Sequence, residues 1–326
     1  MRTVNARLSK LAMLSWLFPL AAVLVIYART AGYPLVWDDL VLSTQPTYAG
    51  CDLAKILMSP ANGFEYLPVR DLTLCFDHAV FAEWAGGFHA TNIFFFGLAA
   101  LLALPLYRTL FGAARTPALA DRAPLLALLA TLVFVLHPLQ VEAVAFVTGR
   151  NSVLALLCLI ASLLAYSRAL ESGGWLSYWS SVALVAAALL SKATALPAPA
   201  LIFLLHLYLA REDGLPRVLR SIAPHTLIAL GLGALHLFIA QQAAIPSDAP
   251  LYEALHRLPR AAFIAQFYVG KFLWPAELTT EYLFGDMREH LGLFGLATAT
   301  VALASARVVF LGLRARTLAC GLVLAY

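Results

Sequence analysis

Two adjacent carboxylates, Asp38 and Asp39, follow the first apolar stretch of the chain in the sequence VWDD. Like charges this close raise the pKa of one of the two groups, and partial burial raises it further. Such a pair suits a general base, a cation site or an anchor for a polar substrate. Two solvated loop residues beside an interfacial Trp37 would give the same pattern, so both interpretations stay open.

Further along, the run EYLPVRD contains Tyr66 and Arg70. A guanidinium is a planar fork of donors that binds a phosphate or a carboxylate through two hydrogen bonds. Arg70 is therefore a candidate for holding a phosphate, with Tyr66 beside it. In the alternative interpretation Arg70 forms a surface ion pair with Asp71 or Glu65, which would contribute little to stability.

The segments FHATN and HPLQVEAVAFVTGRN hold the next polar side chains. His89 and Asn92 have the i, i+3 spacing that places them on one helix face, where His89 is compatible with binding or with packing. We expect Glu142 and Arg150 on one side of a single helix that begins near His137. Polar groups of opposite sign at a membrane boundary indicate a functional site, and a structural Glu142–Arg150 pair is the alternative.

Two more charged residues lie near the ends of apolar runs. Lys192 ends the sequence LLSK, where its ammonium can bind an anion or extend to the lipid headgroups. Glu281 belongs to LWPAELTTEY, which taken alone indicates only a turn at a membrane interface.

The elements that must position these residues are membrane helices. Of the 326 residues, 62% are hydrophobic and 12% are charged, and the mean hydropathy is +0.82. A soluble domain is about half apolar and about a quarter charged, so lipid must cover most of this surface. The net charge of +4 is small and scattered, which argues against a nucleic-acid partner.

Apolar runs long enough to cross a bilayer predict an all-α, polytopic membrane protein with about nine transmembrane helices. The first run reads as an uncleaved helix, and the ninth, from Thr317, is still apolar at Tyr326, so we expect the chain to be a fragment. A further stretch, 261–274, predicts an interfacial helix. The other eight runs lie near 11–29, 89–111, 124–137, 152–170, 177–191, 196–211, 224–243 and 291–313.

Basic residues cluster in alternate connections, which predicts that the amino terminus faces the cytoplasm. The segments 30–88, 137–151, 191–196 and 243–290 then lie on the other side and hold most of the acidic residues. The first of them is a long exoplasmic loop. It contains Cys51 and Cys75, which could pair although no pattern requires it.

The motifs WDD, YxPxR, FHxxN, HPxxxEAVAxxxGR, LLSK followed by LP, and LWPxxLxxxY occur here in that order. This set resembles the transmembrane and tetratricopeptide-repeat O-mannosyltransferases and their bacterial relatives, which belong to the GT-C superfamily of glycosyltransferases. The resemblance spans nearly all of the chain, and HPLQVEAVAFVTGRN is its most specific part. The sequence departs from the family where Ala193 follows Lys192, where Leu67 interrupts YRP, and where Glu281 replaces the usual Asp.

The resemblance implies a GT-C-like domain over 1–326 that is cut within its last helix and lacks the carboxyl-terminal repeats. It implies a polyprenyl- or dolichyl-phosphate sugar, with mannose expected, as donor and a Ser or Thr hydroxyl of an exported protein as acceptor. Asp38 would be the base and Asp39 its partner or a group that orients the acceptor, with inversion at the sugar. The residues expected at the donor phosphate are Arg70, Arg150 and Lys192. Those expected to shape the site are Tyr66, His89, Asn92, His137, Glu142 and Glu281.

No cofactor is required by this chemistry, although a divalent metal beside Asp38 and Asp39 is compatible with it.

The expected location is a bacterial inner membrane, or the endoplasmic reticulum membrane in a eukaryote, with the site on the periplasmic or lumenal side. Three other functions stay open: a GT-C enzyme that modifies a lipid or glycan, a transporter or flippase of lipid-linked sugars, and a catalytically silent membrane scaffold.

Overall fold

The computed structural model describes residues 2–60, 65–243 and 250–279, with the isolated residues 282, 296, 299, 300 and 303. Within these residues the regular structure is entirely helical. The chain divides into two compact units. The first contains the described residues up to Ala243, and the second contains helix α14 (Pro250–Leu273).

Within the described residues, four helical stretches are long and apolar enough to cross a membrane. The first is Ser15–Gly32, which begins in α1 (Arg2–Tyr27), and the others lie in α6 (Ala85–Gly112), α10 (Arg150–Ser172) and α13 (Leu215–Ala243). Three shorter apolar helices accompany them: α8 (Ala123–Leu136), α11 (Trp175–Ser191) and α12 (Ala198–Leu209). These seven match the first seven predicted spans, so the prediction of a polytopic all-α membrane protein is confirmed. The predicted spans at 291–313 and from 317 lie outside the described residues.

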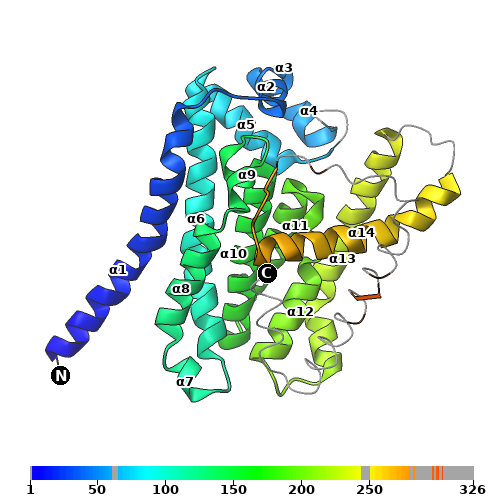
Figure 1. Ribbon diagram of the computed structural model, residues 1–326. Coiled ribbons are helices and arrows are strands. Elements are labelled where there is room, and N and C mark those ends of the chain that lie inside the picture. Colours follow the sequence, from blue (N-terminus) through cyan, green and yellow to red (C-terminus); the bar gives the residue numbers. More distant parts are fainter. Residues whose placement is uncertain are drawn as a thin grey trace. The chain divides into compact units, whose positions relative to one another are not determined.

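Helix α10 lies at the centre of the first unit, packed against α6, α11 and α12 (Figure 1). Small buried residues line these contacts, among them Ala99 and Ala103 on α6, Ala155 on α10 and Ala188 on α11. Small side chains let helix backbones approach closely, which is how membrane helices associate by van der Waals contact. Helix α1 packs beside α6 and α8, with Tyr27 edge-on to Phe96.

The predicted long loop between the first two spans is a cap of short helices over one end of the bundle (Figure 1). Asp52 stabilises the start of one of them by accepting a hydrogen bond from the Lys55 amide. A disulfide between Cys51 and Cys75 ties the cap together and resolves the question that the sequence left open. The helices are η1 (Ala28–Gly32), α2 (Asp38–Ser43), α3 (Pro46–Ala49), α4 (Leu53–Met58) and α5 (Pro68–Phe81).

The prediction that one helix carries both Glu142 and Arg150 is wrong. Helix α9 (Gln140–Ala145) ends early, the backbone is extended at Phe146, and α10 begins only at Arg150. The turn brings Gly149 so near to α9 that a Cβ atom there would lie 2.4 Å from the Ala143 carbonyl oxygen. Short helices α7 (Pro117–Ala120) and η2 (Ala193–Ala195) connect other spans.

In the second unit, α14 begins earlier than the predicted interfacial helix and ends at Leu273, just before Pro275. Lys271 Nζ donates to the carbonyl oxygens of Ala276 and Glu277 at 2.6 and 3.2 Å. These bonds satisfy acceptors directly beyond the helix end, which stabilises its termination.

We expect Gly149→Ala to lower the free energy of unfolding in detergent by about 1–3 kcal/mol, because the added methyl overlaps backbone that cannot move freely. Gly112→Ala is the matched control, since a Cβ there meets no atom within 4 Å. It should leave stability unchanged or slightly raised, as Ala favours a helix over Gly. Equal stability of the two variants in thermal unfolding would show that the α9–α10 turn is not tightly packed.

Candidate active site

Arg150 is fully buried at the first residue of α10, and its guanidinium joins three helices. Its Nη2 lies 2.6 Å from Asp77 Oδ2 on α5, and that carboxylate is also fully buried. Nε donates to Asn92 Oδ1 on α6 at 2.7 Å, and Nη2 donates to the Phe88 carbonyl at 2.8 Å. A buried guanidinium is tolerated only when it is paired and its donors are used, and here both conditions are met.

Asp39, the last residue of the WDD motif, contacts the backbone directly before Arg150. Its Oδ2 accepts from the Val147 amide at 3.0 Å and its Oδ1 from the Thr148 amide at 2.7 Å. The Asp39 side chain is buried, so it anchors α2 on the α9–α10 turn next to Arg150. We call Asp39, Asp77, Asn92 and Arg150 the Arg150 cluster.

The two carboxylates of the WDD motif occupy opposite environments. Asp38 is exposed to solvent, whereas Asp39 is buried in the Arg150 cluster. Trp37 precedes them with a φ of 53°, an unusual value for a bulky residue that indicates local strain. Its ring packs against Phe146, with centroids 6.4 Å apart. The turn at Trp37 therefore fixes the start of α2 and leaves Asp38 accessible.

Asn92 and His89 lie on one face of α6, as predicted from their spacing. Asn92 Nδ2 donates to the Phe146 carbonyl at 2.6 Å, so its amide holds the α9–α10 turn and Arg150 at once. His89 is also buried, within electrostatic reach of Asp39 and of the backbone of Ala145. Both residues shape the surroundings of the Arg150 cluster.

Arg70 is buried and forms the ion pairs that the sequence offered as an alternative. Its Nη2 lies 2.8 Å from Asp71 Oδ1, and its Nη1 lies 3.4 Å from Glu65 Oε2. Tyr48 donates its hydroxyl to the same Asp71 oxygen at 3.0 Å. Burial alone would lower the pKa of Arg70, but attraction and hydrogen bonding by Asp71, together with the electrostatic effects of Tyr48 and Glu65, outweigh it and the pKa is raised.

Lys192 lies directly after α11, half-buried, with Nζ donating to Ser152 Oγ on α10 at 2.6 Å. Burial lowers the pKa of its ammonium, and attraction by Glu65 and Glu142 partly opposes this shift. Glu65 thus lies near both Arg70 and Lys192, so two cations from distant parts of the chain share one acidic neighbour.

Other predicted site residues have local structural contacts. Tyr66 donates its hydroxyl to the Leu57 carbonyl at 2.8 Å, which holds α4 against the loop that follows. His137 Nδ1 accepts from the Leu139 amide at 3.2 Å at the entrance to α9. Glu142 is exposed near Lys192. Glu281 lies outside the described residues.

Sequence reasoning missed Asp77, the ion-pair partner of Arg150. The pattern held a signal for it, because Arg70, Thr73 and Asp77 have i, i+3, i+7 spacing and so share one face of α5. The Thr73 hydroxyl lies 3.5 Å from Arg150 Nη1, and Thr91 donates to Asp77 Oδ1 at 2.7 Å. The polar face of α5, in a protein that is otherwise largely apolar, therefore indicated that these side chains contact a buried polar partner.

An apolar cavity of about 410 Å³ adjoins this polar face between α5 and α6. Phe76, Phe94 and Phe95 contribute to its walls, and Thr73 and Thr91 are its polar lining residues. Because both threonines are bonded to the Asp77–Arg150 pair, the cavity reaches the edge of the Arg150 cluster.

Among the described residues, no group of three or more His, Cys, Asp or Glu side chains could hold a metal ion. Both oxygens of Asp39 are used by backbone amides. The possible metal site at Asp38 and Asp39 stays a prediction from the sequence.

We expect Arg150→Met to lower the free energy of unfolding by about 3–5 kcal/mol, because it leaves the buried Asp77 carboxylate without its charged partner. The control is Arg217→Met, which removes the ion pair of Arg217 with Asp213. Because the Arg217 side chain is 73% exposed, this change should lower the free energy of unfolding by about 1 kcal/mol or less. Thermal unfolding of the purified chain measures both. Similar losses in the two variants would contradict the central role of the Asp77–Arg150 pair.

No family model matches the chain, and no solved structure matches it. Three curated relatives are similar to parts of it. The mouse protein O-mannosyl-transferase TMTC4 is 36% identical over 166 residues, which are 46% of this chain and 22% of the mouse protein. The fruit-fly protein O-mannosyl-transferase Tmtc2 is 30% identical over 205 residues, or 56% of this chain and 20% of that protein.

Human TMTC4, also named a protein O-mannosyl-transferase, is 28% identical over 161 residues, which cover 45% of this chain and 22% of the human protein. The chain therefore spans about a fifth of the length of these relatives. The matches support the resemblance to the transmembrane and tetratricopeptide-repeat O-mannosyltransferases that the motifs predict. Over about half of its own length, the chain is similar to proteins that are named protein O-mannosyl-transferases.

Proposed function

We propose that the chain is a membrane glycosyltransferase that moves mannose from a polyprenyl-phosphate donor to a Ser or Thr hydroxyl of an exported protein. The similarity to protein O-mannosyl-transferases supports the reaction. The observation that carries the proposal is the contact of Asp39 with the Val147 and Thr148 amides. It joins the first-loop acidic motif to the most specific motif of the resemblance, 108 residues away.

In this proposal Asp38 is the general base. The acceptor hydroxyl gives its proton to the Asp38 carboxylate while its oxygen bonds to the anomeric carbon of the sugar. The bond from that carbon to the phosphate oxygen breaks, and the lipid phosphate leaves with the electron pair. Displacement from the opposite face inverts the anomeric centre, and a positioned base contributes roughly 10²–10⁴ in rate.

Lys192 is our first candidate for stabilising the charge on the departing phosphate. Its ammonium is half-buried, and cations in partly desolvated sites stabilise developing negative charge more strongly than cations in water. Arg70 adds positive charge nearby, although Asp71 already holds its guanidinium. The apolar cavity between α5 and α6 would suit part of the isoprenoid chain.

Arg150 was predicted at the donor phosphate, and the structure shows its donors engaged by Asp77, Asn92 and Phe88. We therefore assign Arg150 a positioning role: it fixes the turn that carries the Val147 and Thr148 amides, which in turn hold Asp39.

We place the site on the exoplasmic side of a bacterial inner membrane or, in a eukaryote, of the endoplasmic reticulum membrane. The Cys51–Cys75 disulfide supports this side, because structural disulfides persist in oxidising compartments and are rare in the cytosol. The clustering of basic residues in alternate connections predicts the same orientation.

We expect Asp38→Asn to lower the rate of mannose transfer roughly 10²–10⁴-fold without loss of thermal stability, since Asp38 is exposed and its amide analogue cannot accept the proton. The control is Glu83→Gln, an exposed carboxylate in the connection between α5 and α6. Purified protein, polyprenyl-phosphate mannose and Ser- or Thr-containing peptides give the assay, read by mass spectrometry. Full activity of Asp38→Asn would exclude the assignment of Asp38 as the base.

Donor binding should weaken as the pH rises through the lowered pKa of Lys192, because only the protonated ammonium attracts the phosphate. Lys192→Arg should keep its charge and extend binding to higher pH, whereas Lys192→Gln should bind weakly at every pH. Folding stability should change in the opposite sense: since the unfolded chain holds this proton more tightly, stability rises with pH between the lowered and the ordinary pKa. A pH profile shared by wild type and Lys192→Gln would remove Lys192 from the donor site.

The same assay separates the other functions that the sequence left open. Mannose on a lipid or glycan, with none on peptide, would move the proposal to a different acceptor. Movement of labelled lipid-linked sugar across proteoliposomes without any transfer product would favour a transporter.

A further inference from the structure

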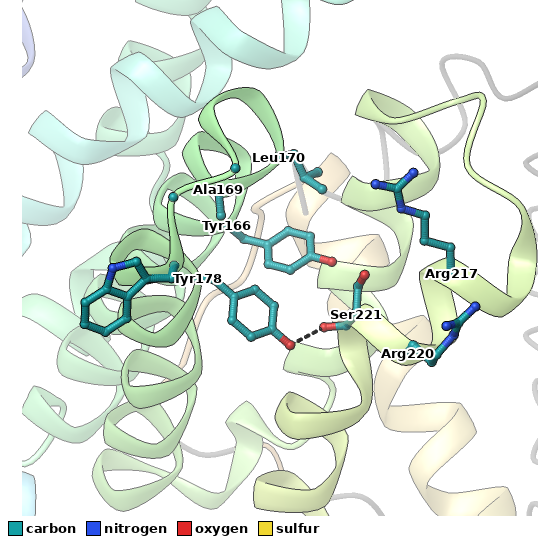
Figure 2. A pocket seen from close by; sticks show the side chains of 10 residues that line it. Tyr166, Ala169, Leu170, Tyr178, Arg217, Arg220 and Ser221 are labelled. Carbon is teal, nitrogen blue, oxygen red and sulfur yellow. Dashed lines mark hydrogen bonds between the residues drawn. The ribbon is translucent and has the colours of Figure 1, made fainter.

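A cavity of about 630 Å³ lies at the end of α10 opposite the Arg150 cluster (Figure 2). Its position follows from the fold, since α10 begins at Arg150 and the cavity surrounds the α10–α11 turn at Gly173. The 23 residues of α10 separate the two sites by roughly 30 Å, at about 1.5 Å per residue. The volume falls within the range of roughly 300–1,000 Å³ typical of small-molecule sites.

The inner wall of this cavity is held in place by hydrogen bonds. Tyr178 donates its hydroxyl to the Ser221 carbonyl at 2.8 Å, which joins α11 to α13 (Figure 2). The buried hydroxyl of Tyr166 bonds His206 Nδ1 at 2.7 Å, and His206 Nε2 lies 3.0 Å from Asp213 Oδ2. Because both tyrosines line the cavity, its shape is set before any ligand arrives.

The outer wall is positively charged. Arg217 and Arg220 both line the cavity from the start of α13, and their i, i+3 spacing places them on one side of that helix (Figure 2). Arg217 shares its charge with Asp213 at 3.0 Å. Among the described residues, no carboxylate lies within ion-pair distance of Arg220, whose Nε donates to the Pro216 carbonyl. The cavity therefore has an excess of guanidinium charge.

The mouth of the cavity is aromatic and exposed. Trp175 lines it and is 73% exposed, and Leu176 and Trp179 in the same turns of α11 are 66% and 52% exposed. Trp and Tyr gather at the headgroup level of a bilayer, where one end of the side chain is apolar and the other is hydrated. A ligand here would meet the two arginines of the outer wall and the exposed apolar side chains at the mouth.

We propose that this cavity binds an anionic membrane lipid, with the lipid phosphate between Arg217 and Arg220 and the acyl chains along Trp175, Leu176 and Trp179. A guanidinium holds a phosphate by paired charge-assisted hydrogen bonds, which accounts for two arginines in a cavity of this size. The exposed apolar side chains favour a lipid over a free phosphate, because a small solute would leave them without contacts. The site is separate from the proposed transferase chemistry.

The test uses the full chain in nanodiscs of phosphatidylcholine with phosphatidylglycerol added, and native mass spectrometry to count the phosphatidylglycerol molecules that stay bound. Wild type should retain phosphatidylglycerol in preference to phosphatidylcholine. Arg217→Gln with Arg220→Gln should weaken this retention about tenfold or more, since both charged donors are removed. If the double variant loses thermal stability, Arg220→Gln alone answers the question, because its side chain is exposed.

The matched control is Arg115→Gln with Arg122→Gln, which removes the same charge from exposed residues outside the cavity at the same end of the bundle. It should retain phosphatidylglycerol as wild type does. Equal loss in both double variants, or no preference for phosphatidylglycerol in wild type, would overturn the proposal. Displacement of the lipid by inorganic phosphate of equal affinity would show a solute site and also overturn it.

Discussion

The ion pair of Asp77 with Arg150 is the contact on which the candidate active site depends. Both charges are fully buried, so each is stable only because the other is present. Asn92 and the Phe88 carbonyl use two more donors of the guanidinium, and through Asn92 the pair reaches the break after α9. In the break between α9 and α10, the Val147 and Thr148 amides are free of helical hydrogen bonds and donate to Asp39. The Arg150 guanidinium, by fixing this break, therefore also fixes the position of the WDD motif.

The fold separates the buried residues that fix the backbone from the accessible residues to which we assign the chemistry. Buried residues of the Arg150 cluster fix the backbone, while Asp38, Glu142 and the half-buried Lys192 remain accessible around it. A catalytic carboxylate gains precision when its neighbours along the chain cannot move. Asp38 is attached to a helix that begins at the strained Trp37 turn and is anchored one residue later by Asp39.

Much of the fold could be predicted, because a bilayer leaves few choices for an apolar chain. The apolar runs locate both the four described helices that are long enough to cross it and the three shorter apolar helices. The site was harder. The i, i+3 relation of His89 and Asn92 is local and was predicted correctly, but Glu142 and Arg150 were placed on one helix because spacing alone cannot show a break that Asp39 and Asn92 stabilise from elsewhere. Asp77 was missed although the polar face of α5 indicated a buried contact, because only the tertiary structure shows that Arg150 on another helix makes that contact.

The Cys51–Cys75 disulfide links the segment after α3 to the helix that carries Arg70, Thr73 and Asp77. In the orientation that we propose, the cap lies on the exoplasmic side, so these thiols would be oxidised only after translocation. The helix that carries the ion-pair partner of Arg150 would then be covalently linked to the rest of the cap as a late maturation step. Newly made chains retained in a reducing environment would have their membrane helices in place but a loosely held cap.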